Sequence, residues 1–183
     1  MASWSKIARR VRVPLGFALA VLYLWLALPT WASIAAGGIV ALLGVLLRAI
    51  ASGHITKDSA LTTTGPYAYT RNPLYLGSML LAAGFALAAR SWWIALAILA
   101  MFLLIYLPVV KDEEAFLRTK FPEFEEYARQ VPRFLPRLRH LPESAPAAFS
   151  RERYLRHREY NAPVGAAVML AALVAKLLWL AHR

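Results

Sequence analysis

Two short polar stretches of this sequence carry side chains that could bind a ligand at the edge of an apolar environment. The first brings Arg71, Asn72 and Tyr75 close together, and the second contains the adjacent Glu113 and Glu114. The two glutamates come just after a run of twenty uncharged residues. Carboxylates at the end of such a run are costly unless a partner accepts them. Arg71 is a candidate partner, and so are the hydroxyl groups of a sugar.

The first stretch, residues 65–77, also has a purely structural interpretation. Gly65-Pro66 signals a turn, and Asn72-Pro73 is typical of a helix start, with asparagine as the cap and proline in the first turn. Tyrosines near the end of a membrane helix can form an interfacial aromatic belt, with Arg71 as an orienting charge. Three tyrosines would belong to this belt: Tyr67, Tyr69 and Tyr75.

The second stretch, residues 111–127, has a structural alternative as well. Glu114 and Arg118 are spaced i, i+4, and a surface ion pair between them would contribute about 0.3–0.5 kcal/mol. Adjacent carboxylates point about 100° apart on a helix, so at most one of Glu113 and Glu114 faces a given ligand. Aromatic residues then recur at every third position, as on a helix that lies in the membrane interface. They are Phe121, Phe124 and Tyr127.

Long apolar runs on either side of these stretches determine the fold class. Of the 183 residues, 60% are hydrophobic and only 17% are charged, whereas soluble domains have about 45–50% apolar and about 25% charged residues. The uncharged run from Val13 to Leu47 has 35 residues and would extend about 52 Å as a single helix. One membrane crossing needs only about 20 residues, so this run predicts a helical hairpin with Pro29 at its turn.

We therefore expect an all-α polytopic membrane protein with about five transmembrane helices and a cytoplasmic helical segment between the fourth and the fifth. The whole chain, residues 1–183, is expected to form one membrane-embedded domain. Its motif-bearing core is predicted at about 50–138, and an additional C-terminal helix at about 162–181, where Lys176 is close enough to the end to snorkel. The five spans are expected at Pro14–Leu28, Trp31–Ile50, Pro73–Ala89, Ser91–Val110 and Ala162–Ala181.

The positive charges predict an orientation. Of the 21 lysines and arginines, 17 lie before the first span, between the second and third, or between the fourth and fifth, and Arg48 lies at the edge of the second connection. The N-terminus and both large connections are therefore expected in the cytoplasm of a bacterium, with the C-terminus on the opposite side of the inner membrane. A competing interpretation makes the first span a signal peptide that is cleaved near Thr30-Trp31-Ala32. The basic residues from Arg151 to Arg158 favour contact with anionic lipids.

Composition excludes several other classes of protein. The net charge is +11, but the basic residues lie in blocks between apolar runs, which argues against a nucleic-acid partner. The high apolar content excludes a disordered tail. The chain has no cysteine, so disulfides, thiolate catalysis and cysteine-ligated metals are excluded. The histidines show no metal-ligand spacing, and no metal is expected. They are His54, His140, His157 and His182.

Taken together, the two stretches resemble the isoprenylcysteine carboxyl methyltransferase and phospholipid methyltransferase group of integral-membrane enzymes. The group shows Gly-x-Tyr and Arg-His-Pro-x-Tyr-x-Gly before a span, and Glu-Glu-x-x-Leu-x-x-x-Phe-Gly with a later tyrosine after the next span. The resemblance covers about residues 50–138. In this chain the pattern is carried by Gly65-Pro66-Tyr67, Arg71 to Gly77, Glu113 to Leu117, Phe121-Pro122 and Tyr127.

The resemblance implies methyl transfer from S-adenosyl-L-methionine to a lipophilic acceptor at the cytoplasmic interface. The acceptor would be an isoprenylcysteine-like carboxylate or another small lipid, with phospholipid N-methylation as the alternative. Arg71 and Glu113 would organise the site electrostatically as its catalytic candidates. The positions implied to contact the cofactor are Ala60, Leu61, Thr62, Tyr67, Asn72, Pro73, Leu74, Tyr75 and Glu113.

Three positions depart from the pattern of the group. Asn72 replaces the histidine, which keeps hydrogen bonding but removes a group that titrates near neutral pH. Pro122 replaces the glycine and stiffens that turn. Val109 stands where the prenylcysteine enzymes carry an arginine associated with the substrate, so a carboxylate acceptor has lost its expected partner.

Two other functions stay open from the sequence. The related nicotinamide-dependent membrane sterol reductases have a partly similar C-terminal architecture, although this chain lacks a glycine-rich dinucleotide fingerprint. The chain could also be a membrane scaffold that keeps the methyltransferase shape without its activity. The sequence predicts neither an oligomeric state nor a function for the fifth span.

Overall fold

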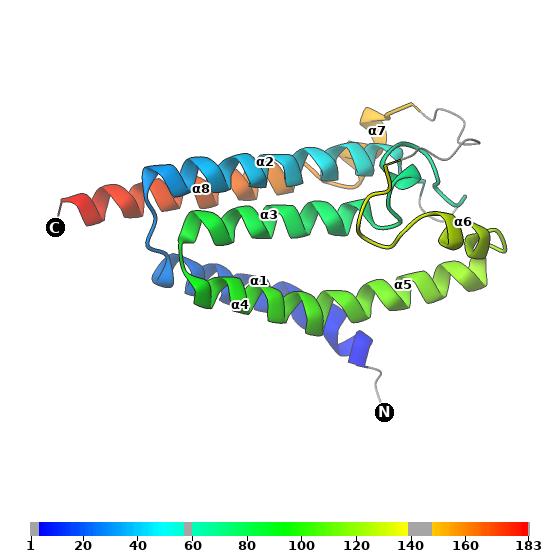
Figure 1. Cartoon of the computed structure of the whole chain (residues 1–183), viewed down its shortest axis with the longest axis horizontal. Coiled ribbons are helices and arrows are strands. Elements are labelled where there is room, and N and C mark those ends of the chain that lie inside the picture. The colour runs from blue at the N-terminus through cyan, green and yellow to red at the C-terminus, as the bar shows by residue number, and fades with distance from the viewer. Residues whose placement is uncertain (1–3, 57–59, 139–147, 183) are drawn as a thin grey trace.

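The computed structural model describes residues 4–56, 60–138 and 148–182, and within this part of the chain every regular element is helical. The fold is that of an all-α membrane protein, as predicted, with long helices side by side along one axis (Figure 1). The elements are α1 (Trp4–Leu26), α2 (Trp31–His54), the 3-10 turn η1 (Gly65–Ala68), α3 (Pro73–Ala89), α4 (Trp92–Met101), the π-helix η2 (Phe102–Tyr106), α5 (Leu107–Lys120), α6 (Phe124–Gln130), α7 (Arg151–Arg156) and α8 (Asn161–Ala181).

The uncharged run forms two helices, α1 and α2, as predicted, but they do not pack on each other as a hairpin: α2 packs on α3 and α8, and α1 packs on the helix formed by α4, η2 and α5 (Figure 1). The turn falls at residues 27–30, and Thr30 caps α2 because its side chain accepts a hydrogen bond from the Ser33 amide at 3.2 Å. The expected start at Pro14 is wrong, however, because α1 begins at Trp4 and has Pro14 in its interior. The four basic residues before the span, which lack the turn signals of a helix end, continue the helix instead.

The α2–α3 pair is the most closely packed pair in the molecule. Four glycines bring the two backbones together, because a Cβ atom at any of them would overlap atoms of the facing helix. Small residues at helix interfaces permit this approach inside a membrane. The glycines are Gly37 and Gly44 on α2, and Gly77 and Gly84 on α3. The pair therefore forms a rigid unit that fixes where α3 begins.

The fourth span is longer than expected. Helices α4, η2 and α5 are continuous from Trp92 to Lys120, 29 residues in all. The helix continues beyond Val110, where the expected span ends, because no proline or glycine follows until Pro122. The continuous helix carries Glu113 and Glu114 on its last turns, beyond the apolar part.

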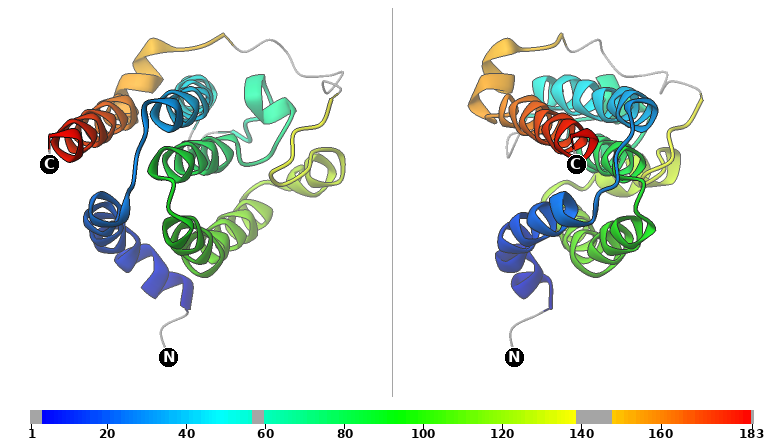
Figure 2. Two further views of the ribbon diagram at one scale, coloured as in Figure 1. Left: turned by 60° about the vertical axis from the view of Figure 1, so that its left-hand side comes forward. Right: turned by 90° about the vertical axis from the view of Figure 1, so that its left-hand side faces the viewer.

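The aromatic side chains of helix α6 pack inward, whereas one interpretation of their spacing had them facing the membrane interface. Phe124 and Tyr127 are buried in a small core with Val131, and this core packs against Leu61 and Leu117. Figure 2 shows α6 beside the end of α5, with the following segment running back towards η1. The aromatic spacing therefore builds a core that holds two distant segments together.

The C-terminal helix α8 packs against α2 and α1. Lys176, which was expected to snorkel, makes specific hydrogen bonds. Its Nζ donates to the carbonyl oxygens of Leu24 at 2.7 Å and Trp25 at 2.9 Å. These carbonyls belong to the last turn of α1, where helical partners are missing. Helix α8, the fifth predicted span, is thus hydrogen-bonded to the C-terminal end of α1, the first.

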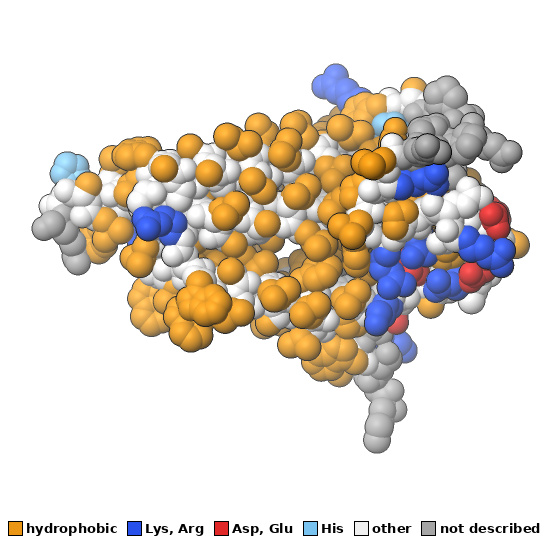
Figure 3. Space-filling model, viewed as in Figure 1, with side chains coloured by type: hydrophobic (Ala, Val, Ile, Leu, Met, Phe, Trp, Pro, Cys, Tyr) orange, Lys and Arg blue, Asp and Glu red, His pale blue; other side chains and the backbone are white. Residues whose placement is uncertain are grey.

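Among the residues that the structure describes, three helices are long and apolar enough to cross a membrane, namely α2, the continuous Trp92–Lys120 helix and α8. The remaining two predicted spans, within α1 and α3, are shorter apolar helices at Val13–Leu26 and Pro73–Ala89. Figure 3 shows apolar side chains over most of the helical body, with most charged side chains at the end that carries α6. The polar stretches of the sequence therefore gather at one end of the helices.

Candidate functional site

A polar cavity of about 230 Å³ lies at this charged end of the molecule. It forms where the segment after α2, the η1 turn, the start of α3, the last turns of α5 and α6 meet. Its lining residues are Ile55, Thr56, Ala60, Leu61, Thr62, Tyr67, Arg71, Asn72, Glu113, Glu114, Phe116, Leu117, Phe121, Phe124 and Tyr127. Segments far apart in the chain thus contribute to one space.

Most of the positions implied by the family resemblance line this cavity. Six of the cofactor positions are in its wall, namely Ala60, Leu61, Thr62, Tyr67, Asn72 and Glu113, and so is the catalytic candidate Arg71. Pro73 and Leu74 do not line it, because they turn away in the first turn of α3. Tyr75 lines a second, apolar cavity nearby.

Glu114 is the buried centre of the cavity wall, with 2% of its side chain exposed. Arg133 binds both of its oxygens, with Nη2 at 2.8 Å from Oε2 and Nε at 3.1 Å from Oε1. The amide of Asn72 donates to Oε1 at 2.9 Å, and Arg71 lies at ion-pair distance, with Nε 3.7 Å from Oε1. Glu114 therefore holds together three segments of the chain.

This arrangement corrects two expectations. Glu114 does not pair with Arg118, which instead bonds Glu125 at 2.8 Å, because burial of Glu114 turns it away from the surface. The side chain of Asn72 does not cap α3, although the residue stands in the cap position. Its amide also donates to the Arg133 carbonyl at 3.3 Å, so it joins the network around Glu114.

Arg133 is the residue that sequence reasoning missed. It follows α6 in a segment without regular structure, and its type alone gave no role. Its neighbours run beside the turn that carries Tyr67: the amide of Arg71 donates to the Pro132 carbonyl at 2.9 Å, and Thr70 Oγ1 donates to the Arg133 carbonyl at 3.1 Å. Hydrogen bonding to Glu114 raises the pKa of Arg133.

Glu113 takes a different partner from its neighbour. The hydroxyl of Tyr75 donates to its Oε1 at 3.1 Å, so the two glutamates face different groups, as the 100° helical spacing predicted. Glu113 is exposed at the rim of the polar cavity. The contact between Glu113 and Tyr75 stands at the boundary between the polar and apolar cavities.

Two buried polar atoms in the wall have no hydrogen-bond partner among the described residues, namely the hydroxyl of Tyr67 and Nε of Arg71. Buried polar groups usually find a partner, so such atoms mark a position that a ligand can complete. The Tyr67 carbonyl is held by the hydroxyl of Tyr127 at 2.7 Å, which fixes the turn. Burial raises the pKa of Tyr67 and lowers that of Arg71, where Glu114 opposes the effect.

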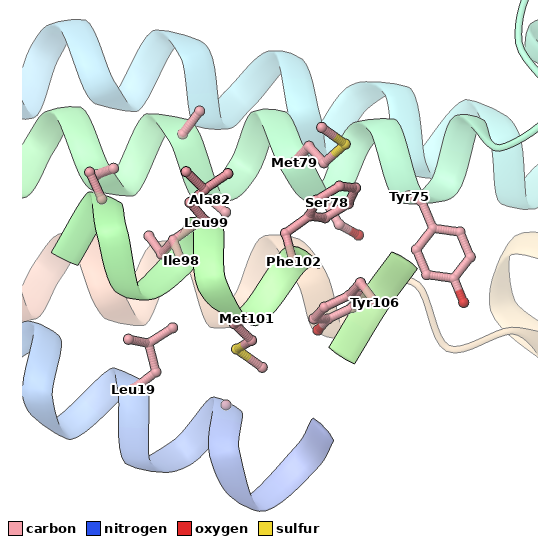
Figure 4. A pocket seen from close by; sticks show the side chains of 14 residues that line it. Leu19, Tyr75, Ser78, Met79, Ala82, Ile98, Leu99, Met101, Phe102 and Tyr106 are labelled. Carbon is pink, nitrogen blue, oxygen red and sulfur yellow. The ribbon is translucent and has the colours of Figure 1, made fainter. Parts of the chain in front are cut away.

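The apolar cavity has a volume of about 430 Å³ and lies between α1, α3 and the α4–η2 helix. In Figure 4, Leu19, Met79, Ile98 and Phe102 lie around it, with Tyr75 at one end. The π-helix η2 contributes Phe102 and Tyr106 to its wall. Single π-helical turns inside α-helices often occur at functional sites. Such a space suits a hydrocarbon chain.

A metal centre is not apparent in the described part of the chain. No group of three or more histidine, cysteine, aspartate or glutamate side chains there could hold a metal ion. His140 lies outside the described residues.

The helices and the two cavities, whose walls meet at the Tyr75–Glu113 contact, define an all-α membrane protein with a polar site at one end. The chain belongs to the phospholipid methyltransferase family, whose model matches residues 11–123, well over half of its length. The recognition made from the two polar stretches is therefore confirmed, and the family points to a membrane methyltransferase.

Two relatives are metal resistance proteins by name. The chain is 40% identical over 82 residues to the cobalt-zinc-cadmium resistance protein CzcN of Cupriavidus metallidurans, which covers 45% of this chain and 38% of the relative. It is 39% identical over 82 residues to the nickel-cobalt-cadmium resistance protein NccN of Alcaligenes xylosoxydans xylosoxydans, with the same coverage. The matched region is thus well under half the length of either relative. No solved structure matches the chain.

Proposed function

We propose that this protein transfers a methyl group from S-adenosyl-L-methionine to a lipophilic acceptor at the cytoplasmic surface of a bacterial inner membrane. The observation that carries the proposal is the polar cavity, which joins Tyr67, Asn72 and Glu113 and meets the apolar cavity at the Tyr75–Glu113 contact. A water-soluble methyl donor and a lipid acceptor need such neighbouring spaces. The family of the chain is consistent with this reaction.

The residues of the polar cavity fit the chemical groups of the donor. The Glu113 carboxylate is an acceptor for ribose hydroxyls. The start of α3 suits the donor's own carboxylate, because the N-terminus of a helix attracts anions. The rings of Tyr67 and Tyr75 suit the sulfonium through a cation–π contact of about 0.5–2 kcal/mol. The unpartnered hydroxyl of Tyr67 offers one further polar contact.

Methyl transfer is a direct displacement, in which the sulfur–methyl bond breaks as a bond to the acceptor atom forms. Its products are the methylated acceptor and S-adenosylhomocysteine. Holding the two reactants in line, away from water, can supply much of the rate. In this chain Arg71, which lies 3.7 Å from Glu114, and Glu113 would organise the charges around the donor.

The surroundings of the apolar cavity favour an uncharged or amine-bearing acceptor over a carboxylate. Val109, at the position of the substrate-associated arginine of the prenylcysteine enzymes, is buried in an apolar cluster with Ala8 and Ile105. The charged residue at the junction of the two cavities is the carboxylate Glu113. Like charges repel, so an amine-bearing lipid suits this junction better than an isoprenylcysteine carboxylate.

Calorimetry of the detergent-solubilised protein with S-adenosylhomocysteine tests the donor site. We expect wild type to bind and Glu113→Ala to bind about ten- to a hundredfold more weakly, because a hydrogen bond to a charged group contributes about 1.5–3 kcal/mol. The matched control is Glu126→Ala, an exposed glutamate that pairs with Arg129 on α6, and its affinity should equal that of wild type.

Three results would refute the proposal. Wild type that binds no S-adenosylhomocysteine would exclude the donor site. Binding of NADPH in its place would favour a sterol-reductase-like enzyme. Binding without transfer of radiolabelled methyl groups to a membrane-lipid extract would favour an inactive scaffold. Mass spectrometry of lipids from cells with and without the protein would then identify the acceptor.

A further inference from the structure

The segment of residues 149–160, which includes α7, packs on the end of α2 and lies wholly beyond the part of the chain that the family model matches. It supplies partners for carbonyl groups in the last turn of α2, where helical partners are missing. Three contacts do this: Ser150 N to Gly53 O at 3.0 Å, Arg153 Nη1 to His54 O at 2.9 Å, and His157 Nδ1 to Ser52 O at 3.2 Å. The wall of the polar cavity begins directly afterwards, at Ile55.

A line of packed rings connects this segment to the turn that carries Tyr67. The ring of Phe149 lies directly on Gly53, where a Cβ atom would overlap it, and 6.2 Å from the ring of His54. His54 in turn lies against Gly65, where an added Cβ would be 2.5 Å from the imidazole. Gly65 has a φ of +58° and begins the η1 turn, so this glycine is required both for conformation and for space.

A second connection is the ion pair between Arg48 and Glu159. The guanidinium binds both carboxylate oxygens, with Nη2 at 2.8 Å from Oε1 and Nε at 3.1 Å from Oε2. The pair is mostly buried, with 23% of the Arg48 side chain and 12% of the Glu159 side chain exposed. Arg48 Nη1 also donates to the Leu74 carbonyl and to the hydroxyl of Ser78, in the first turns of α3.

The ion pair also acts on the unpartnered hydroxyl of Tyr67. Burial is the main cause of its raised pKa, with smaller raising effects from Tyr127, Glu159 and Glu113 and a lowering effect from Arg48. Neither Arg48 nor Glu159 lines the polar or the apolar cavity. Both residues therefore act on the cavity from behind its wall.

We infer that the 149–160 segment is a positioning element for the donor cavity, in which Glu159 acts through Arg48 on the start of α3 and Phe149 acts through His54 on the Tyr67 turn. The inference rests on the proposed function, since the cavity is taken to bind S-adenosyl-L-methionine. It gives a role to a part of the chain outside the family match. Glu159 and Arg48 are positioning residues and do not touch the donor.

Two measurements on Glu159→Gln test this inference. Calorimetry should show binding of S-adenosylhomocysteine weakened about tenfold, because a smaller fraction of molecules holds the binding-competent wall. Hydrogen exchange followed by mass spectrometry should show faster exchange of amides in residues 60–72, with little change in α4. The control is Glu152→Gln, which breaks the exposed pair with Arg156 on the same segment and should change neither result.

The charge at position 159 distinguishes positioning from general destabilisation while it leaves the contacts of Arg48 with α3 in place. Glu159→Lys sets two cations against each other and should abolish binding, whereas Glu159→Asp keeps a carboxylate opposite Arg48 and should retain most of the affinity. Unchanged affinity and unchanged exchange in Glu159→Gln would overturn the inference, and so would a Glu159→Asp protein that binds no better than Glu159→Lys. Should wild type bind no S-adenosylhomocysteine, the proposed function fails, and the exchange of residues 60–72 alone decides the positioning role.

Discussion

Two adjacent glutamates, Glu113 and Glu114, have different positions and different partners in the polar cavity. Glu114 is buried and binds Arg133, Asn72 and Arg71, so it shapes the wall. Glu113 is at the rim, where it meets Tyr75. The same residue type one position apart thus serves structure in one case and, in our proposal, ligand binding in the other. Helical spacing is the reason, since it turns the two side chains to different neighbours.

Removal of Arg133 should therefore destabilise the fold. Arg133→Ala leaves the buried Glu114 carboxylate without its two-point partner, and we expect a loss of about 1–3 kcal/mol in the free energy of unfolding. Thermal unfolding in detergent measures it. The control is Arg129→Ala, whose side chain is 77% exposed and whose loss should change stability by less than about 0.5 kcal/mol. Equal effects of the two substitutions would show that the Glu114 network is not stabilising.

The buried phenol of Tyr67 predicts a dependence of stability on alkaline pH. Burial raises its pKa, so above about pH 10 the unfolded chain releases this proton while the folded chain keeps it. Release of this proton stabilises the unfolded state, so the free energy of unfolding falls as the pH rises. Tyr67→Phe should lessen this fall by up to about 1.4 kcal/mol per pH unit. Unfolding midpoints between pH 9 and 11.5 measure the difference, and at pH 7 the two proteins should show the same slope. Parallel curves throughout would contradict a buried phenol.

At the scale of elements, the close approach of α2 and α3 fixes the site. A Cβ atom on Gly44 would lie 2.5 Å from the Gly77 carbonyl oxygen. Gly44→Ala should therefore force the helices apart and cost about 1–3 kcal/mol. The matched control is Gly38→Ala in the same helix, where an added Cβ has no neighbour within 4 Å. Unfolding midpoints in detergent compare the two.

The same comparison also reports on the site, because α3 begins with Asn72 and Pro73. We expect Gly44→Ala to weaken binding of S-adenosylhomocysteine while Gly38→Ala leaves it unchanged. A Gly44→Ala protein as stable as Gly38→Ala would show that the two helices are packed less closely than the structure has them.

The continuous helix from Trp92 to Lys120 has a second positioning role. Its π-helical part, η2, lines the apolar cavity, and its last turns carry Glu113 and Glu114 into the polar cavity. One helix thus contributes to both spaces. A break in the helix near Lys111 would have separated them.

On the scale of the whole molecule, the two ends differ in how many charged side chains they carry. The net charge is +11, and most charged side chains on the face in Figure 3 lie at the end that carries α6. The positive-inside rule then predicts that this end, with both the polar cavity and the basic α7, faces the cytoplasm. Anionic lipids of that surface would attract the basic segment.

The absence of cysteine makes this orientation testable by labelling. Single cysteines can be introduced as Ser91→Cys, between α3 and α4, and as Glu125→Cys, at a side chain that is 60% exposed on α6. A membrane-impermeant maleimide applied to whole bacterial cells should label the first and not the second. Permeabilised cells serve as the control, because both positions should react there. The opposite pattern would reverse the predicted orientation.

The sequence by itself determined the class of fold, the division of the first uncharged run into two helices, the helix Pro73–Ala89 and the family. These follow from apolar run length and from short motifs, which are local properties of the chain. It also named most residues around the polar cavity, through the resemblance. Whether they bind the donor stays a prediction.

Only the tertiary structure decided which charges meet. Nothing in the local sequence shows that Arg133 reaches Glu114. The local sequence also does not show that Arg48 pairs with Glu159, 111 positions away. The same holds for Glu114, whose local spacing indicated Arg118. A buried carboxylate takes the partner that the packing of helices brings within reach, because burial excludes the water that would otherwise accept it. Such pairings depend on the packing of distant segments, so local spacing does not reveal them.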